Sequence, residues 1–498
     1  MFNRTHKLTR QRTVNLPMVL KVTGWLLMVE ALFMLIPMTV GIAAAEADWL
    51  VFAVTAAVTA ACGFGMRCIP VGSSGGHMGR REGFLLTATV WIWFSLFGML
   101  PLMFCRHHLG VSDAFFQAMS GFTTTGASSL GTARLSMCVN LWLVLSQWLG
   151  GMGIILFTLA VIPMLNSAGG MQMFNAEVTG ITHDKVRPRI SSTAKALWGT
   201  YMTLTALTFL CLWVGPMDAY QSLCYAMASL STGGFVGSCE PLPSFGSDYV
   251  YAIITVFMFL GGVNFTLIFK NWWSTRSPSG MWHNEVFRAF VCITLVCYAL
   301  TVTSMAVGGQ VHSWQDAVLY PMFHTVSMLT SASFDSGHFG YWSPLIICVT
   351  LFMMMSGACA GSTTGGVKID RVLIVLKHLR NEIYKCVRPN AVLSIRMNGR
   401  VLSSGTIGKV GAFMFLYVII VFGAAMALSM MGMSFGDALF APFSCMSNVA
   451  FDISLTDFGA DFSLLPAPAK WLLSAVMLVG RLEIYTIVIL FTPPFWRK

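Results

Sequence analysis

Strongly apolar runs of about 20 residues or more recur along the chain, and each is long enough to cross a lipid bilayer. The first run, 16–45, follows a basic leader, MFNRTHKLTRQR. The run is too long for the apolar part of a secretory signal, so we expect a retained helix rather than a cleaved signal. Only 10% of the residues are charged, whereas soluble domains carry about 25%. The chain is therefore expected to be a polytopic membrane protein.

The net charge of +10 indicates membrane orientation rather than nucleic-acid binding. If the N-terminus is cytoplasmic and the apolar runs alternate in direction, nearly all Lys and Arg residues fall on the cytoplasmic side. Only Arg106, Arg134 and Lys470 fall outside, an asymmetry known as the positive-inside rule. We therefore expect a multi-pass protein of the inner (cytoplasmic) membrane, surrounded by lipid, with both termini cytoplasmic and no nucleic-acid partner.

One pattern occurs four times: a long apolar run, a shorter stretch that begins with Asp-Ala, a segment rich in Gly, Ser and Thr, and a second apolar run. The short stretches begin at Asp113, Asp218, Asp316 and Asp437, at intervals of 105, 98 and 121 residues. Asp is favoured in any first helical turn, but the shared position between two apolar runs argues for fourfold duplication. Because the short stretches cannot cross a bilayer, we expect each to enter and return on the same side.

The Gly/Ser/Thr segments are unusual for a membrane protein. The first, GFTTTGASSL at 121–130, is uncharged, and LSTGGFVG, TSASFDSG and SNVAFDIS are partial echoes of it. Irregular backbone at membrane depth is tolerated only inside the protein or along a water-filled cavity. Four such segments around one axis can direct carbonyl oxygens at a dehydrated cation, and glycine permits the left-handed backbone that this requires. The pattern predicts a cation selectivity filter.

Further motifs extend the series. They are QWLGGMGIILFTLAVIPML (147–165), KVRPRISSTAKALW (185–198), GGVNFTL (261–267), GACAGSTTGGVKIDR (357–371) and GRLEIYTIVILFTPPFWRK (480–498). Together with the filter segments, this ordered series resembles the TrkH/KtrB/HKT superfamily of potassium transporters, and its TrkH branch in particular. The resemblance covers nearly the whole chain.

The resemblance implies an all-α polytopic membrane protein. Four span–pore helix–span repeats are expected around one pore in a pseudo-fourfold arrangement, preceded by two extra transmembrane helices. We assign the N-terminal pair of helices to 1–82 and the four repeats to 83–190, 191–283, 284–400 and 401–498.

The resemblance also implies an ion site, with K⁺ as the transported ion and no covalent cofactor. The expected K⁺-binding filter residues are Thr124, Thr125, Gly126, Ser231, Thr232, Gly233, Ser331, Ala332, Ser333, Asn448, Val449 and Ala450. Gly126 and Gly233 match the family's central filter glycine, whereas Ser333 and Ala450 stand where glycine is expected. Since a left-handed backbone costs a non-glycine residue about 1–2 kcal/mol, these two strands either tolerate strain or point fewer carbonyls inward. Discrimination between K⁺ and Na⁺ stays open.

Small residues interrupt the second span of the third repeat. Glycine inside a helix costs about 1 kcal/mol relative to alanine, so a broken helix is expected there, and broken helices mark ion pathways in transporters. The resemblance implies a gate loop that obstructs the pore beneath the filter. Its residues are Gly357, Ala358, Cys359, Ala360, Gly361, Ser362, Thr363, Thr364, Gly365, Gly366 and Lys368. Lys368 either holds the loop closed or anchors the following half-helix. The segment is not a nucleotide-binding P-loop, because Val367 separates the last glycine from the lysine.

Arg481 lies within an otherwise apolar run. An arginine at the centre of a membrane helix costs about 2.5–3.5 kcal/mol and usually faces a cavity or a partner. Glu483 is two positions on, so it faces elsewhere on a continuous helix. The matching arginine of the family projects into the permeation path, so we assign Arg481 as a pore barrier; a structural arginine bonded to loop carbonyls is the alternative.

These features predict potassium uptake by channel-like conduction. The resemblance implies a homodimer with one pore per subunit and a cytoplasmic, TrkA-like ring of nucleotide-binding regulatory subunits. The basic connectors 185–195 and 377–409 are candidate docking surfaces, although topology alone explains them nearly as well.

Two alternatives are a K⁺ symporter coupled to Na⁺ or H⁺ and a poorly selective K⁺/Na⁺ conductor. A symporter needs embedded carboxylates, and the spans offer few besides Glu30, Glu483 and the pore-helix aspartates. An enzyme would need clustered His, Cys or acidic residues, and none is evident. A disulfide among the outer cysteines, Cys105, Cys138 and Cys239, stays open.

Overall fold

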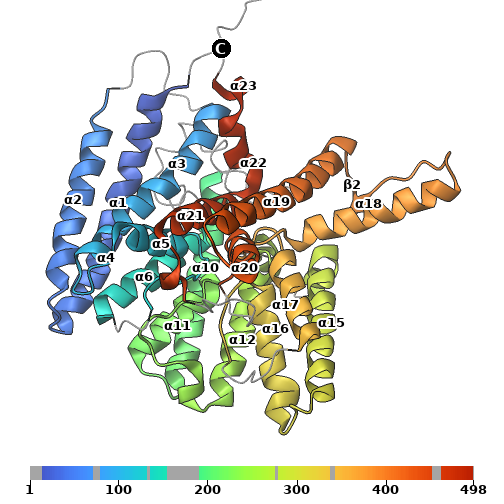
Figure 1. The fold of residues 1–498 in the computed structure, drawn as a ribbon, viewed down its shortest axis with the longest axis horizontal. Coiled ribbons are helices and arrows are strands. Elements are labelled where there is room, and N and C mark those ends of the chain that lie inside the picture. Colours follow the sequence, from blue (N-terminus) through green and yellow to red (C-terminus); the bar gives the residue numbers. More distant parts are fainter. Residues whose placement is uncertain are drawn as a thin grey trace, which may run out of the picture.

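The computed structural model describes residues 14–70, 79–131, 135–153, 190–274, 279–336, 343–450 and 461–496. Helices dominate this part of the chain, as expected (Figure 1). The described strands are two short ones, β1 (Arg396–Met397) and β2 (Arg400–Val401), which form an antiparallel hairpin.

The first two helices, α1 (Leu16–Ala43) and α2 (Trp49–Arg67), form a hairpin at one side of the molecule (Figure 1). They approach closely at two glycines, because a Cβ on Gly24 would lie 2.5 Å from the carbonyl oxygen of Gly63. Close approach at small residues is typical of membrane helices. The turn between the helices is tied to the next part of the chain, since Asp48 accepts hydrogen bonds from the Arg106 N–H (3.2 Å) and the Ser136 hydroxyl (2.6 Å).

The remaining helices can be grouped by the four expected repeats. Repeat 1 contains α3 (Arg80–Gly98), α4 (Leu100–Phe104), α5 (Val111–Phe122) and α6 (Met137–Gly151). Repeat 2 contains α10 (Ile190–Val214), α11 (Ala219–Ser231), a short 3₁₀ turn η1 (Leu242–Phe245), α12 (Asp248–Gly262), α13 (Phe265–Ile268), a π-helical turn η2 (Phe269–Ser274) and α14 (Ser279–Trp282).

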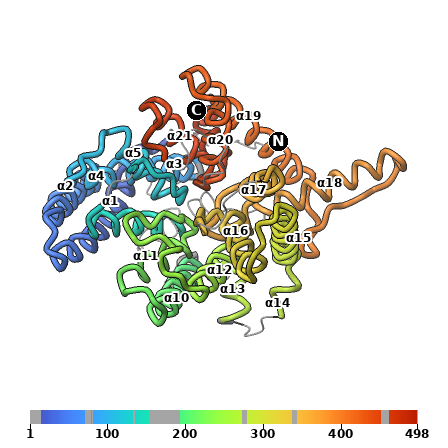
Figure 2. The backbone as a smooth tube through the Cα atoms, turned by 60° about the horizontal axis from the view of Figure 1, so that its bottom comes forward, coloured from blue at the N-terminus to red at the C-terminus, as the bar shows by residue number. Residues whose placement is uncertain are grey.

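The last two repeats follow the same order. Repeat 3 contains α15 (Glu285–Val307), a π-helical turn η3 (Gln315–Leu319), α16 (Tyr320–Leu329), α17 (Pro344–Ser356) and α18 (Ile369–Val387). Repeat 4 contains α19 (Ser404–Met430), α20 (Phe435–Ser447), η4 (Phe462–Leu464), α21 (Ala467–Arg481), α22 (Glu483–Val488), η5 (Ile489–Phe491) and α23 (Pro493–Trp496). Figure 2 shows the short helices α5, α11, α16 and α20 around a common centre, in chain order.

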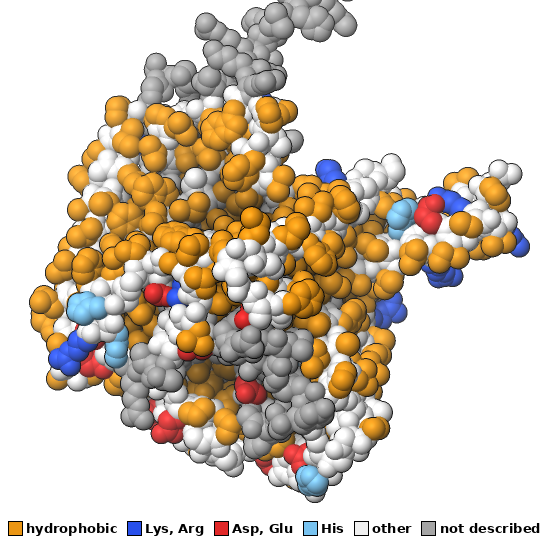
Figure 3. Space-filling view, viewed as in Figure 1, with side chains coloured by type: hydrophobic (Ala, Val, Ile, Leu, Met, Phe, Trp, Pro, Cys, Tyr) orange, Lys and Arg blue, Asp and Glu red, His pale blue; other side chains and the backbone are white. Residues whose placement is uncertain are grey.

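The described surface fits a lipid environment. Six described helices are each long and apolar enough to cross a membrane. In Figure 3, hydrophobic side chains cover most of the described surface of this face, and Lys and Arg side chains gather on α18, which projects from the body.

More spans are broken than the sequence indicated. Besides the expected gap between α17 and α18, the pair α12 and α13 bends by 100°, and the pair α21 and α22 bends by 113°. The side chain of Asn264 accepts hydrogen bonds from the N–H groups of Thr266 and Leu267 and so starts α13 as a new helix. At the other break Glu483 has a φ of 58°. The expectation of a continuous span around Arg481 was therefore wrong.

Candidate ion filter and gate

The four pore helices, α5, α11, α16 and α20, end in the same backbone motif. After each helix one residue adopts a left-handed conformation: Thr124 (φ 55°), Thr232 (φ 55°), Ser331 (φ 55°) and Asn448 (φ 52°). The N–H of the next residue then bonds back to a carbonyl of the pore helix, in the pairs Thr125 to Ser120, Gly233 to Ala228, Ala332 to Ser327 and Val449 to Ser444. This is the hydrogen bonding of a Schellman cap, and it sets the register of the four repeats.

The motif defines four equivalent three-residue segments, which we call filter strands 1 to 4: 124–126, 232–234, 331–333 and 448–450. Gly126 (φ 78°) therefore corresponds to Gly234 (φ 72°), not to Gly233, and Ser231 is the last residue of α11. The sequence alignment of the second repeat was one residue out of register, because STGGF can be matched to TTTGA on either glycine. The starting aspartates do not define the register, since their distance from the left-handed residue differs between repeats.

The two non-glycine strands solve the strain differently. Ser333 adopts a left-handed φ of 56°, whereas Ala450 does not have a positive φ. Ser333 therefore tolerates a conformation that costs about 1–2 kcal/mol outside glycine, and Ala450 avoids it.

Glycines on the second spans pack closely behind the ends of two pore helices. A Cβ would lie 1.8 Å from the Phe122 carbonyl oxygen if added to Gly150, and 2.4 Å from the Met446 carbonyl oxygen if added to Gly480. Phe122 and Met446 each lie two residues before the left-handed residue of their strand. Because a real Cβ never lies so close to a backbone oxygen, only glycine allows this approach. The sequence analysis did not assign these glycines a role, although Gly480 stands next to a helix break.

The gate loop lies directly against three filter strands. The Thr363 hydroxyl donates to the Leu230 carbonyl at 3.1 Å and contacts the Thr232 hydroxyl at 3.3 Å. The N–H of Gly365 donates to the Ser331 hydroxyl at 2.9 Å. A Cβ on Gly365 would lie 2.3 Å from the Ser447 carbonyl oxygen, beside strand 4. The loop thus contacts the pore-helix ends of repeats 2, 3 and 4.

The helix break of repeat 2 holds the other half of the loop. The amide Nδ2 of Asn264 donates to the Ala360 carbonyl at 2.6 Å, and the Phe265 N–H donates to the Gly361 carbonyl at 3.0 Å. The Cys359 N–H donates to the Gly262 carbonyl at 3.1 Å. Asn264 is a residue that sequence reasoning missed. Its position in GGVNFTL was visible, but the break that exposes it was not.

Arg481 joins the gate loop to repeat 1. Its guanidinium donates to the Thr363 carbonyl at 2.8 Å, to the Gly151 carbonyl at 3.0 Å and to the Gly150 carbonyl. The residue stands at the C-terminal end of α21 rather than at a helix centre. The carbonyls at a helix C-terminus favour a positive charge. These are the bonds expected of a structural arginine bonded to loop carbonyls.

A cavity of about 90 Å³ lies beside the loop, with Arg481, Lys368 and Glu483 in its lining. This volume holds several water molecules. Lys368 is buried and directly precedes α18 with a φ of 74°, so it occupies the end of the loop that joins the half-helix.

An ion pair fixes the start of α18. Arg371 pairs with Glu483 at 2.5 Å, and its guanidinium lies 4.2 Å from the centre of the Phe413 ring. It also donates to the Val367 carbonyl at 3.1 Å. Glu483 therefore pairs with Arg371, a residue of the third repeat, across the break that follows α21.

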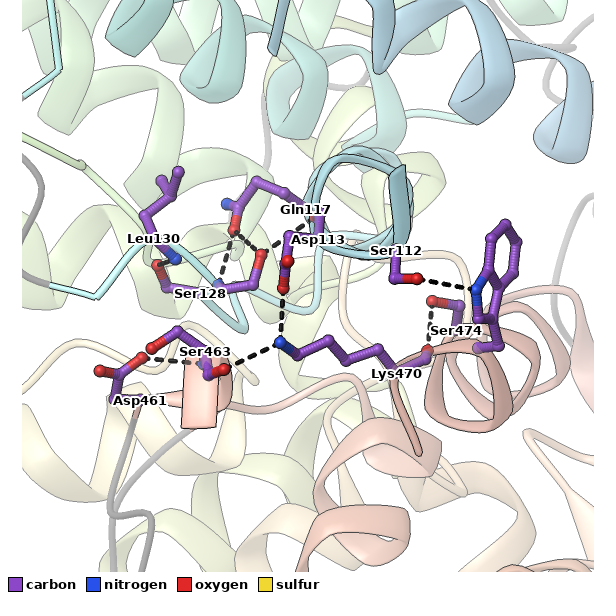
Figure 4. A network of polar contacts seen from close by, with 11 residues as sticks. Ser112, Asp113, Gln117, Ser128, Leu130, Asp461, Ser463, Lys470 and Ser474 are labelled. Carbon is purple, nitrogen blue, oxygen red and sulfur yellow. Dashed lines mark hydrogen bonds and ion pairs between the residues drawn. The ribbon is translucent and has the colours of Figure 1, made fainter. Parts of the chain in front are cut away.

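Repeats 4 and 1 meet on the opposite side of the filter in a polar network (Figure 4). The ammonium of Lys470 contacts the Asp113 carboxylate at 2.5 Å and donates to the Ser463 carbonyl at 2.8 Å. The Phe462 N–H donates to the Ser128 carbonyl at 2.9 Å. This network joins α21 to α5 and closes the ring of repeats. The sequence analysis assigned Lys470 only to an outer charge.

No disulfide joins Cys105, Cys138 or Cys239, all of which are described and free. Within the described ranges, no three His, Cys, Asp or Glu side chains are grouped so that they could hold a metal ion.

Comparisons with known proteins cover nearly the whole chain. A family model described as "Cation transport protein", TrkH, matches residues 71–498. The "Trk system potassium uptake protein TrkH" of Escherichia coli (strain K12) is 32% identical over 483 residues, which are 96% of this chain and 99% of that protein. TrkH of Halomonas elongata is 32% identical over 497 residues, 97% of this chain and 100% of that protein.

The fold also matches a solved structure. The crystal structure of the potassium transporter TrkH from Vibrio parahaemolyticus aligns with a TM-score of 0.85 at 30% sequence identity. The alignment covers 97% of this chain and 100% of that chain.

Proposed function

Because the chain belongs to the TrkH family of cation transport proteins, we propose that it takes up potassium across the cytoplasmic membrane by channel-like conduction. The family is a transporter family, so the chain is a transport protein and not an enzyme. Potassium as the substrate follows from the names of the relatives. The observation that carries the proposal is the shared left-handed end of four pore helices around one centre (Figure 2). Such ends bring backbone carbonyls together as ion ligands.

We propose that the gate loop obstructs this path. Its bonds to Leu230 and Ser331 place Thr363 and Gly365 against the ends of the filter strands. We propose that conduction requires the loop to leave these partners, and that Arg481 is both a clamp on the loop and a positive barrier to cations. Both roles follow from one guanidinium that bonds the Thr363 carbonyl and lines the cavity.

A regulatory partner would act on the loop through α18. This helix continues the loop on its C-terminal side and projects from the body (Figure 1), with exposed cationic side chains along it. We propose that a cytoplasmic, TrkA-like nucleotide-binding ring docks on the connector 377–409. Of the other connector, 185–195, residues 185–189 lie outside the described residues, and 190–195 form the first turns of α10.

We also propose a homodimer in the membrane. Supporting it, α18 exposes Leu376, Leu379 and Ile383 while projecting from its own subunit, and α19 exposes Phe415 and Phe422. A second subunit would cover part of this apolar surface.

A symporter coupled to Na⁺ or H⁺ is the second candidate, and Glu30 is the observation that favours it. Glu30 is fully buried in α1, and its carboxylate oxygens accept no hydrogen bond from the described residues. Buried membrane carboxylates mark proton pathways in pumps and transporters. However, Glu30 lies beside Gly98 and does not line the cavity next to the gate loop. The carboxylate in that lining is Glu483.

The decisive experiment is flux in proteoliposomes, measured side by side for K⁺, Rb⁺, Na⁺ and Li⁺. Channel-like K⁺ conduction predicts a reversal potential that follows the K⁺ gradient alone. A reversal potential that also moves with a Na⁺ or H⁺ gradient at fixed stoichiometry supports the symporter. Absence of any K⁺ flux in the presence of the regulatory partner would contradict both proposals.

A further inference from the structure

Adjacent filter strands touch in a repeating way. A Cβ added to Gly126 of strand 1 would lie 2.2 Å from the Gly233 carbonyl oxygen of strand 2. One added to Gly234 of strand 2 would lie 1.7 Å from the Ala332 carbonyl oxygen of strand 3. In strands 2 and 3 the middle carbonyl therefore lies against the third residue of the preceding strand. Only glycine fits at that third position.

Strand 3 breaks this rule, because its third residue is Ser333. Its left-handed φ of 56° resembles that of the glycines. By analogy with Gly126 and Gly234, its Cβ would overlap a Val449 carbonyl of strand 4 that pointed in the same direction. The Val449 carbonyl instead accepts a hydrogen bond from the hydroxyl of Ser444, in its own pore helix. The equivalent serines of repeats 1 and 3 bond carbonyls further along their strands, since Ser120 donates to Ala127 at 2.7 Å and Ser327 donates to Phe334 at 2.9 Å.

The N–H side of the same peptide also points differently. The Ala450 N–H donates to the Ser333 hydroxyl at 2.9 Å and to the Thr125 carbonyl at 3.1 Å. Reversing a peptide plane changes φ of its second residue from positive to negative, as between type II and type I turns. Ala450 lacks the positive φ of Gly126 and Gly234. The carbonyl, the N–H and φ therefore all indicate one reversed peptide, Val449–Ala450.

We propose that Ser333 and Ala450 together reverse the Val449–Ala450 peptide, that Ser444 holds it reversed, and that these three residues set the ion selectivity of this filter. The inference rests on the proposed cation conduction. At this peptide strand 4 directs its N–H to the Ser333 hydroxyl and the Thr125 carbonyl, while Ser444 bonds its Val449 carbonyl, so strand 4 offers one carbonyl fewer to an ion. A cage with fewer oxygen ligands discriminates less strongly between cations, because selectivity depends on the number and field strength of the coordinating carbonyls. The filter therefore discriminates weakly between K⁺ and the smaller Na⁺ and Li⁺.

The test compares K⁺, Na⁺ and Li⁺ fluxes of glycine variants in proteoliposomes. In Ser333→Gly/Ala450→Gly the fourth carbonyl can return, and the K⁺/Na⁺ flux ratio is expected to rise about tenfold, the effect of one recovered polar ligand. Ala450→Gly alone leaves the ratio unchanged, because the Ser333 Cβ still blocks the carbonyl. Ser333→Gly alone gives a smaller rise, because alanine resists the left-handed conformation. This non-additive pattern is the signature of two residues acting on one peptide.

Ser444→Ala provides the matched control for the hydroxyl. Ser444→Ala is expected to change the K⁺/Na⁺ flux ratio of the wild type. It is expected to leave the ratio of the double-glycine variant unchanged, because the returned carbonyl no longer accepts a hydrogen bond from that hydroxyl. A double-glycine variant that conducts K⁺ with the wild-type K⁺/Na⁺ ratio overturns the inference and leaves the proposed function standing. If the double variant does not fold, an unchanged ratio in Ser333→Gly overturns it equally. Loss of K⁺ flux in the wild type, by contrast, counts against the proposed function.

Discussion

Replacing Arg481 by alanine is the most informative perturbation of the gate. The guanidinium donates a hydrogen bond to the Thr363 carbonyl of the loop at 2.8 Å and also bonds carbonyls at the end of α6. A hydrogen bond from a charged donor contributes about 1.5–3 kcal/mol. Its loss shifts the balance between the docked and released loop by about 10- to 100-fold. We therefore expect Arg481→Ala to conduct faster than the wild type by up to that factor.

The assay is Rb⁺ or K⁺ flux into liposomes containing the purified protein, without the regulatory partner, so that the loop alone limits conduction. Arg481→Lys separates the two roles of the residue. It keeps the positive charge, but a compact ammonium cannot span the Thr363 and Gly151 carbonyls as a planar guanidinium does. If the charge is the main barrier, the lysine variant conducts like the wild type. If the clamp dominates, it conducts nearly as fast as the alanine variant.

The reasoning is refuted by a folded Arg481→Ala protein whose flux equals or falls below that of the wild type. Elution as a single species in detergent, with an unchanged unfolding temperature, establishes that the variant is folded. In that case Arg481 supports the pore structure and neither clamps the loop nor repels cations.

Three further predictions concern the same region. Deleting 361–366 removes the loop residues that contact the filter strands and is expected to raise flux without the partner; unchanged flux excludes the loop as the obstruction. Glu483→Gln leaves the buried Arg371 without its carboxylate partner, which typically costs about 3–5 kcal/mol of folding stability. A clear drop in unfolding temperature is therefore expected, and an unchanged temperature contradicts the ion pair found at 2.5 Å. Gly150→Ala places a Cβ 1.8 Å from a pore-helix carbonyl and should abolish flux, whereas Gly199→Ala, with no atom within 4 Å, should leave flux unchanged. Normal flux in Gly150→Ala argues against close packing behind strand 1.

The gate loop is hydrogen-bonded to residues of the filter strands. Thr232 and Ser331 are the left-handed residues of strands 2 and 3, and their hydroxyls are the groups that contact Thr363 and Gly365 of the loop. When the loop leaves, these hydroxyls become available to water or to an ion at the end of the filter.

The amino-acid sequence by itself determined the membrane class and the repeated order of spans and short helices, and it located the Gly/Ser/Thr segments that we propose as filter and gate loop. These features are local. Apolar length decides whether a segment crosses a bilayer, and glycine with small polar residues marks irregular backbone whatever its neighbours. Arg481 was visible for the same reason, since a charge in an apolar run is costly wherever the run lies.

Only the tertiary structure decided the contacts between repeats. The pairing of Glu483 with Arg371 and the role of Asn264 each depend on contacts between residues far apart in the sequence. The alignment of Gly126 with Gly234 depended on the backbone conformation at the ends of the pore helices, which the residue types alone left ambiguous. The direction of the Val449 carbonyl is the clearest case. It is set by a side chain in the neighbouring strand, because a peptide plane turns at little local cost while a steric overlap across the strand boundary permits only one orientation.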